Sequence, residues 1–198
     1  PADGILYVNL SSETIAKNPP HRAAVTYGLR PDADYFAADI AVDTTGTTFT
    51  LVHGDERQKF STKLIGAANV ENIVGALAAA NGYGIPLADL VPAVRTLRAV
   101  PHRMELLDRG AITIIDDAFN SNPAGAAAAL ETLGRFDAMR IIVTPGMIEL
   151  GDRGDALNAE LGARAAAVCD VIVAVGEKQA KPILRGAREA GADEKKLY

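Results

Sequence analysis

The sequence predicts an α/β protein in two parts: strands followed by a pair of helices, and then a doubly wound parallel sheet. Three observations support this. A long run at residues 35–43, a well-alternating segment at residues 47–53 and a third segment at residues 58–64 after the turn pair Gly54-Asp55 predict an antiparallel meander. Hydrophobic residues recur at helical spacing from residue 70 to residue 97. After residue 100, short β-branched runs alternate with longer helical segments, as they do in parallel sheets.

The first part, residues 1–100, combines strands with two helices. Asn69 is a suitable N-cap for the first helix and Gly82 a suitable end, and Pro86 precedes the second helix. We expect strands at residues 5–9, 23–27, 35–43, 47–53 and 58–64, and helices at residues 70–82 and 87–97.

The second part, residues 101–198, begins near Val100-Pro101, where the pattern changes. We expect strands at residues 104–107, 111–115, 140–143 and 171–175, and helices at residues 123–133, 156–168 and 179–190. Leu197-Tyr198 is expected to begin another strand, which would leave the sheet unfinished. Residues 112–115 are typical of a buried parallel strand. The loop at 144–151 should then lie at the same sheet edge as the turn that follows residue 115.

Composition excludes several classes of function. A net charge of −5 without a basic cluster argues against nucleic-acid or anionic-membrane binding. A single cysteine, Cys169, excludes an internal disulfide and fits a reducing cytoplasm. No apolar run is long enough to span a bilayer, and no signal peptide is visible. Because the chain begins without Met and stops just after a helical pattern, we expect a piece of a longer protein.

The turn after residue 115 is the first candidate for a site. Its sequence, A-I-T-I-I-D-D-A-F-N-S-N-P from residue 111, ends an apolar run on Asp116 and Asp117 and then presents Asn120 and Asn122. Carboxylates accept hydrogen bonds from hydroxyl groups, and amides offer both a donor and an acceptor to a polar substrate. The alternative is structural: Asn122 caps the next helix with Pro123 at its first position, and Asp116 caps the turn.

Three other stretches carry candidate residues. Asn69 and Asn72 are three apart, so they share a helix face, where amides can bind a purine edge; simple capping is the alternative. Arg103, in V-P-H-R-M-E, can bind phosphate oxygens as a planar fork, or form a surface ion pair with Glu105. Glu149 lies in T-P-G-M-I-E-L-G, either as a site residue or as an exposed loop acid.

Several familiar motifs are missing. The chain has no G-x-x-x-x-G-K-[ST] phosphate loop and no G-x-G-x-x-G, and its three histidines show no metal-ligand spacing. We therefore expect no metal ligands among the site residues, and no Ser-His-Asp or Cys-His arrangement suggests itself.

Taken in order, these stretches resemble the Mur ligase family, most closely its MurF branch. The matching pieces are L-I-G-A-A-N-V-E-N-I-V-G-A-L-A-A-A, A-V-P-H-R-M-E, I-I-D-D-A-F-N-S-N-P and V-T-P-G-M-I-E-L-G. The resemblance covers nearly the whole chain, and D-D-A-[FY]-N-[SA]-N-P is rather specific to that branch. It implies that residues 1–100 are the second half of an ATP-binding central domain and that residues 101–198 are most of a Rossmann-like C-terminal domain. The phosphate-loop half would lie outside this chain.

The resemblance also implies an activity. The family uses ATP and Mg²⁺ to convert a carboxylate into an acyl phosphate, which an amine then displaces. The MurF branch joins D-Ala-D-Ala to UDP-MurNAc-tripeptide in the cytoplasm for peptidoglycan synthesis. By family position, Asn69 and Asn72 contact adenine, Arg103 acts on the ATP phosphates as the catalytic residue, and Asp117 contacts the ribose. Asn120 and Asn122 face the acceptor, and most magnesium ligands lie outside this chain.

Two positions depart from the family pattern. Ala68 stands where the family commonly has His, and Ser11 and Ser12 follow Asn9 where acidic residues are common. The leading hypothesis is a piece of a MurF-type ligase that is inactive and binds nucleotide weakly by itself. The alternatives are another amide ligase of the superfamily, of the folylpolyglutamate or cyanophycin type, and a non-catalytic relative that has lost the ATPase half.

Overall fold

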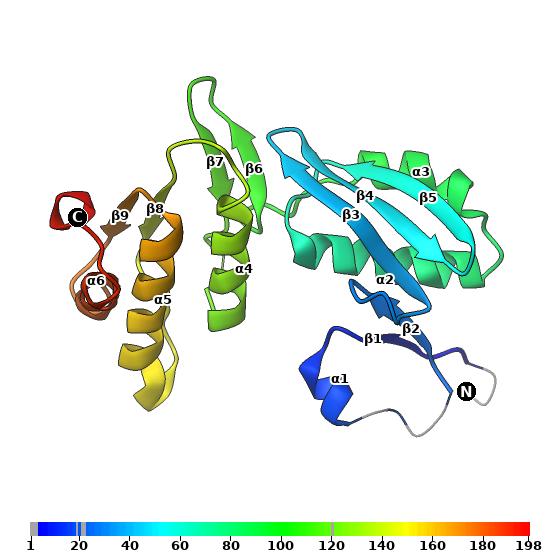
Figure 1. Ribbon diagram of the computed structural model, residues 1–198, viewed down its shortest axis with the longest axis horizontal. Coiled ribbons are helices and arrows are strands. Elements are labelled where there is room, and N and C mark those ends of the chain that lie inside the picture. The colour runs from blue at the N-terminus through cyan, green and yellow to red at the C-terminus, as the bar shows by residue number, and fades with distance from the viewer. Residues whose placement is uncertain (1–3, 19, 21–22, 120) are drawn as a thin grey trace. The chain divides into compact units, whose positions relative to one another are not determined.

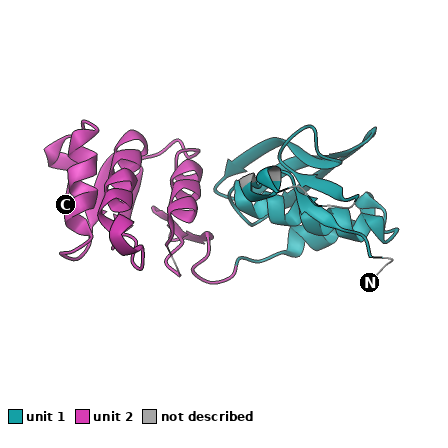
Figure 2. Ribbon diagram, turned by 90° about the horizontal axis from the view of Figure 1, so that it is seen from below, with its two compact units in different colours: residues 1–99 teal, residues 100–198 magenta. Residues whose placement is uncertain are grey.

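The computed structural model describes residues 4–18, 20, 23–119 and 121–198. The chain divides into two compact units, residues 1–99 and residues 100–198, which are coloured separately in Figure 2. The change of pattern near Val100-Pro101 coincides with this division. None of the helices in the described part of the chain combines the length and the apolar character needed to cross a membrane.

Unit 1 contains one five-stranded sheet (Figure 1). Its strands, in the order in which they pair, are β1 (Tyr7–Asn9), β2 (Val25–Gly28), β3 (Tyr35–Asp43), β4 (Gly46–His53) and β5 (Glu56–Thr62), and the short helix α1 (Glu13–Lys17) connects β1 and β2. The pairs β1–β2 and β2–β3 are parallel. The pairs β3–β4 and β4–β5 are antiparallel, so the predicted meander is confirmed.

Two helices cover this sheet, α2 (Ala67–Gly82) and α3 (Leu87–Thr96). Apolar side chains of α2 pack on Phe49, Leu51 and Phe60, which are 0–1 % exposed. Glycines let α2 approach the first strands closely: a Cβ at Gly82 would lie 1.9 Å from the Tyr7 hydroxyl. Burial of these aromatic and aliphatic side chains is the main source of stability in unit 1.

Unit 2 begins with a hairpin and continues as alternating strands and helices (Figure 1). The hairpin strands β6 (Glu105–Asp108) and β7 (Thr113–Asp116) are antiparallel, whereas β8 (Ile141–Thr144) and β9 (Val171–Ala174) are parallel. The helices are α4 (Pro123–Leu133), α5 (Gly154–Val168) and α6 (Ala180–Glu189), with 3₁₀ turns η1 (Gly151–Arg153) and η2 (Glu194–Lys196). Leu197 adds a parallel bridge to Ile172, as expected for the start of another strand.

The core of unit 2 lies between the parallel strands and their helices. Ile172, Ile183 and Leu161 are at most 4 % exposed and belong to one apolar cluster. Helices α5 and α6 pack closely because each has a glycine at the contact. A Cβ on Gly162 would lie 1.9 Å from the carbonyl oxygen of Ile183, and a Cβ on Gly186 would lie 1.9 Å from the carbonyl oxygen of Ala159.

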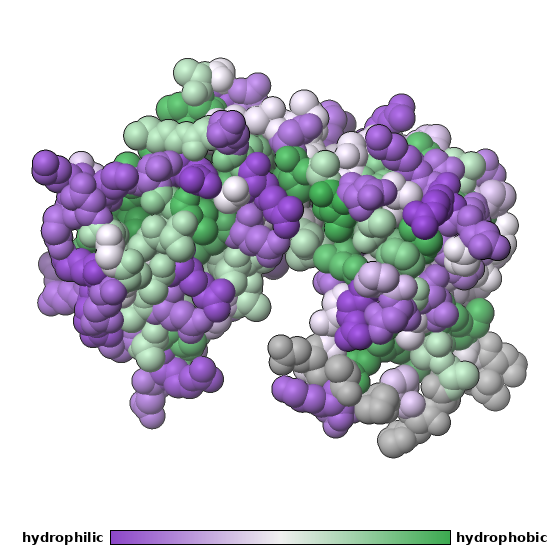
Figure 3. All heavy atoms as spheres, in the orientation of Figure 1, coloured by the Kyte–Doolittle hydropathy of each residue, from purple (hydrophilic) through white to green (hydrophobic). Residues whose placement is uncertain are grey.

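The expectation of a buried parallel strand at residues 112–115 is wrong. β7 pairs antiparallel with β6 around the Asp108-Arg109-Gly110 turn, and Ile112 and Ile114 are 64 % and 42 % exposed. Figure 3 shows exposed hydrophobic residues of the protein in green, among hydrophilic residues in purple. In the described part of the chain β7 and β8 belong to separate sheets, so the loop 144–151 and the turn after β7 do not share a sheet edge.

Candidate functional site

Two turns of unit 2 are joined by a set of hydrogen bonds. The turn before β6 carries His102, Arg103 and Met104, and the turn after β7 runs from Asp116 to Phe119. The amide of Phe119 donates to the carbonyl oxygen of His102 at 3.1 Å. His102 and Met104 have φ values of +63° and +49°, a region that side chains other than glycine rarely adopt. Strain of this kind persists only where surrounding contacts fix the backbone.

Asp116 supplies one of those contacts. Its Oδ2 lies 2.8 Å from His102 Nδ1, and its Oδ1 accepts from the amide of Ala118 at 3.2 Å. The side-chain hydrogen bond with His102 is the main reason that the pKa of Asp116 lies below its usual value, and the bond from Ala118 adds to it. Asp116 is therefore ionised at neutral pH and ties the two turns together.

Asp117 supplies a second contact from the adjacent position. Its Oδ1 accepts from the amide of Met104 at 3.1 Å. Burial raises the pKa of the Asp117 carboxyl, and the Met104 amide and the nearby Arg103 charge oppose that rise in part. One oxygen of this half-buried carboxylate thus has a backbone partner on the neighbouring turn.

Arg103 lies between the two strained residues and stacks on an aromatic ring. Its guanidinium carbon is 4.1 Å from the ring centroid of Phe119, a cation–π geometry. No ion pair joins Arg103 to Glu105 in the described structure; the Glu105 carboxylate instead accepts from the amide of His102 at 3.3 Å. Sequence reasoning did not single out Phe119, although an aromatic residue that is 62 % exposed directly after two acids is a detectable signal.

The asparagines of this turn are described only in part. Asn120 lies outside the described residues. Asn122 is the N-cap of α4, where its side-chain oxygen accepts from the amide of Gly125 at 2.9 Å and Pro123 occupies the first helical position. The capping role is therefore confirmed for Asn122.

Asn69 and Asn72 lie in unit 1, near the start of α2. The expectation that Asn69 is the N-cap is wrong: the helix starts at Ala67, and Gly66, with φ of +91°, is the N-cap. Asn69 instead donates from Nδ2 to the carbonyl oxygen of Ile65 at 2.8 Å, which orients its amide, and Asn72 is exposed three residues later.

Ser11, one of the residues that depart from the family pattern, forms hydrogen bonds with its near neighbours. Asn9 Oδ1 accepts from the amide of Ser11 at 2.9 Å, and Ser11 Oγ accepts from the amide of Leu29 at 3.2 Å. Ser11 therefore joins the ends of β1 and β2.

The loop after β8 is organised by a buried residue that sequence reasoning missed. Asn158, 2 % exposed, accepts from the amide of Met147 at 2.8 Å and donates to the carbonyl oxygens of Met147 and Gly154, both at 2.9 Å. Glu149 is exposed, with φ of +60°. Its position matches the loop-acid alternative.

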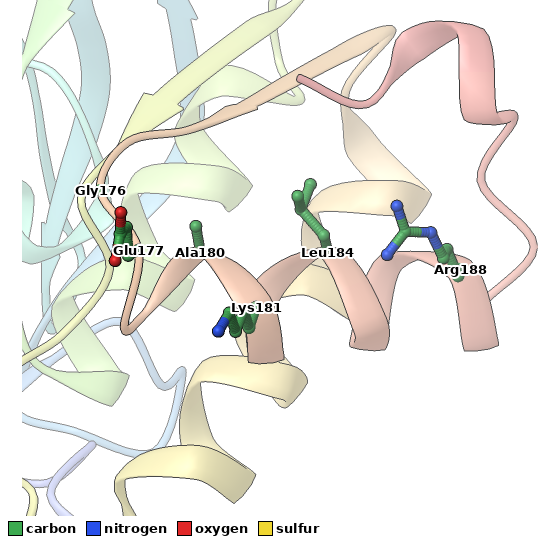
Figure 4. Close-up of a pocket in the computed structure, with 6 residues that line it drawn as sticks. All are labelled: Gly176, Glu177, Ala180, Lys181, Leu184 and Arg188. Carbon is green, nitrogen blue, oxygen red and sulfur yellow. The ribbon is translucent and has the colours of Figure 1, made fainter.

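An open hollow lies along α6, and none of the site residues predicted from the sequence lines it. It is lined by Gly176, Glu177, Ala180, Lys181, Leu184 and Arg188 (Figure 4). Of its two basic residues, Lys181 and Arg188, the second already forms an ion pair with Glu194. Nothing in its lining indicates a specific ligand.

Comparison with known proteins gives the family. A model described as "Mur ligase middle domain" matches residues 1–80, and one described as "Mur ligase, glutamate ligase domain" matches residues 102–197. UDP-N-acetylmuramoyl-tripeptide–D-alanyl-D-alanine ligase of Bacillus subtilis is 31 % identical over 81 % of this chain and 35 % of its own length. UDP-N-acetylmuramoyl-L-alanyl-D-glutamate–2,6-diaminopimelate ligase of Halalkalibacterium halodurans is 34 % identical over 65 % of this chain and 26 % of its own length.

Solved structures agree with these matches. A crystal structure of MurF from Acinetobacter baumannii has a TM-score of 0.83 and 26 % identity, with 98 % of this chain and 42 % of that chain covered. MurF ligase from Thermotoga maritima in complex with ADP, 23 % identical with a TM-score of 0.79, shares the fold over 98 % of this chain and 43 % of its own. The chain spans about a third of the length of the Bacillus subtilis ligase and about a quarter of that of the Halalkalibacterium halodurans ligase. The chain belongs to the Mur ligase family and contains its middle and C-terminal domain types.

Proposed function

We propose that this chain is part of an ATP-dependent ligase that joins D-Ala-D-Ala to UDP-MurNAc-tripeptide in the cytoplasm. The observation that carries the proposal is the pair of turns in unit 2, where Arg103 is held between two strained residues and beside Asp117. These turns contain the V-P-H-R-M-E and D-D-A-F-N-S-N-P stretches. A fixed guanidinium next to a carboxylate is suited to a nucleotide, which offers both phosphates and hydroxyl groups.

In this proposal, Arg103 binds the ATP phosphates and stabilises charge on the phosphoryl group during transfer. Stacking on Phe119 limits the positions that the guanidinium adopts, so less side-chain freedom is lost when phosphate binds. Asp117, with one oxygen held by the Met104 amide, accepts hydrogen bonds from ribose hydroxyls through its other oxygen. Mg²⁺, when bound, neutralises phosphate charge, and we expect its ligands mostly outside this chain.

The asparagines have separate roles. Asn69, oriented by its bond to Ile65, and the exposed Asn72 contact the adenine edge from unit 1. Asn120 and Asn122 are assigned to the acceptor substrate. The side-chain oxygen of Asn122 is engaged in capping α4, so its NH₂ group is the part that serves a substrate.

The proposed chemistry has two steps. A carboxylate oxygen of UDP-MurNAc-tripeptide attacks the γ-phosphorus of ATP, and the bond between that phosphorus and the bridging oxygen breaks to release ADP. The amine of D-Ala-D-Ala then attacks the carbonyl carbon of the acyl phosphate, loses a proton, and expels inorganic phosphate. Exclusion of water protects the acyl phosphate from hydrolysis.

The test is an acceptor screen on the full-length polypeptide that contains this chain, with ADP release and coupled product as readouts. UDP-MurNAc-tripeptide with D-Ala-D-Ala should give ATP-dependent product, and Arg103→Lys should lower the rate because a point charge replaces a planar fork. UDP-MurNAc-dipeptide with diaminopimelate should give none. Product only with diaminopimelate, or with a folate and glutamate, would assign a different ligase; no product with any pair would favour the non-catalytic alternative.

The chain of 198 residues by itself should be inactive. It contains no phosphate-loop motif, so the site for the β- and γ-phosphates is incomplete and nucleotide binding should be weak. Ligation by this chain alone, or micromolar ATP affinity in a calorimetric titration, would contradict this part of the proposal.

A further inference from the structure

Two carboxylates face each other across the hairpin of unit 2. Glu105 and Asp116 are direct partners in the antiparallel register of β6 and β7. Like charges in directly opposite positions destabilise a strand pair, unless a positive group lies between them. Such a pair therefore favours a cation at this end of the hairpin.

A histidine completes the cluster from the preceding turn. One donor atom each from His102, Glu105 and Asp116 can be chosen so that all three lie within 4.8 Å of one another. The linear sequence conceals this set, because Asp116 is fourteen positions from His102 and reaches it only through the strand pairing.

The backbone already orients these donors. Asp116 Oδ1 is bound by the Ala118 amide, which leaves Oδ2 on the side of His102. Glu105 Oε2 is bound by the His102 amide at 3.3 Å. The His102 side chain is 60 % exposed and that of Asp116 20 %, so an ion can enter from solvent and water can complete its coordination.

The donor set selects a class of ion. One imidazole and two carboxylates suit first-row divalent transition ions such as Zn²⁺ or Co²⁺, whereas Mg²⁺ and Ca²⁺ prefer oxygen ligands alone. Donors on a tetrahedral ion with bonds near about 2.1 Å lie roughly 3.4 Å apart. His102 Nδ1 and Asp116 Oδ2 are 2.8 Å apart and share a hydrogen bond, so a bound ion replaces that bond and its proton is released to solvent. We propose that His102, Glu105 and Asp116 form a binding site for a divalent transition-metal ion, with water as the fourth ligand.

The first experiment uses the 198-residue chain without an affinity tag, stripped of metal with a chelator and titrated with Co²⁺. The expected result is saturable binding of one ion per chain, with the visible absorption band of tetrahedral Co²⁺, which Zn²⁺ then displaces. In the unsubstituted protein, Zn²⁺ should shift the ring signals of His102 in NMR spectra and leave those of His53 in place. The absence of a band at millimolar Co²⁺, or unshifted His102 signals, would overturn the proposal.

Substitutions assign the ligands. His102→Asn, chosen because asparagine tolerates a left-handed backbone, and Asp116→Asn should each weaken Co²⁺ binding about tenfold or more. His53→Ala and Asp108→Asn are the matched controls, since His53 stacks on Tyr35 in unit 1 and Asp108 caps the other end of the hairpin through Gly110. Equal loss of affinity in the controls would also overturn the proposal. The NMR result on the unsubstituted protein decides the matter if a variant fails to fold.

Discussion

Replacing Asn158 by alanine should destabilise unit 2 by about 3 kcal/mol. The side chain is 2 % exposed and makes three hydrogen bonds to backbone groups of Met147 and Gly154, at 2.8, 2.9 and 2.9 Å. Each such bond contributes about 1 kcal/mol, and the buried Met147 amide would also lose its partner, which makes this sum a conservative figure. For a unit of this size the expected fall in melting temperature is roughly 12–24 °C.

Urea unfolding followed by circular dichroism measures the change, and hydrogen exchange at the Met147 amide shows whether unit 2 is the part affected. Asn158→Asp should be no better than alanine, because a carboxylate cannot donate to the two carbonyl oxygens. Asn72→Ala, at an exposed helix position, is the control and should stay within about 0.5 kcal/mol of the original. A loss below about 1 kcal/mol for Asn158→Ala would refute the reasoning.

Three further predictions concern unit 2. Asp117→Asn should match or exceed the original stability at pH 7, because burial raises the pKa of Asp117 and its charge is costly above that pKa. The advantage should vanish below about pH 4, where Asp117 is protonated in both the folded and the unfolded protein. An advantage that grows at low pH would contradict this. Gly186→Ala should destabilise unit 2 by more than about 2 kcal/mol in urea unfolding, because its Cβ would clash with the backbone of Ala159. Gly154→Ala is the control and should be neutral or stabilising, since a Cβ there has room. Equal effects of the two substitutions would refute the packing argument. Asn122→Ala should cost about 1 kcal/mol and speed exchange of the Gly125 amide, and unchanged exchange would exclude the cap.

Local patterns predicted the elements whose causes are local. The strand Tyr35–Asp43 and the helix Pro123–Leu133 have the expected bounds. The strand is a long, mostly apolar run, and the helix begins at a capping asparagine followed by proline. The antiparallel meander followed from the Gly54-Asp55 turn in the same way.

The two errors have different causes, one distant in the sequence and one local. A β-branched run such as residues 112–115 suits both a buried parallel strand and an exposed hairpin strand, and its partner β6 determines which one forms. Asn69 appeared to cap α2, but Gly66 adopts a positive φ and the helix starts earlier.

The sequence predicted which residues belong to the candidate site, but it did not predict the contacts between them. Arg103 and Asp117 were singled out from motifs, and the structure brings their turns together. The stack of Arg103 on Phe119 and the cluster of His102 with Glu105 and Asp116 join residues 11 to 16 positions apart, across the hairpin. Sequence spacing therefore gave no indication of them.

The most direct test of the proposed function follows an oxygen atom. UDP-MurNAc-tripeptide labelled with ¹⁸O in its terminal carboxylate is supplied with ATP, Mg²⁺ and D-Ala-D-Ala to the full-length polypeptide that contains this chain. If an acyl phosphate forms, one labelled oxygen leaves with the phosphoryl group, and mass spectrometry should find ¹⁸O in inorganic phosphate. Label in AMP, or ATP consumption with no label in phosphate, would contradict the account.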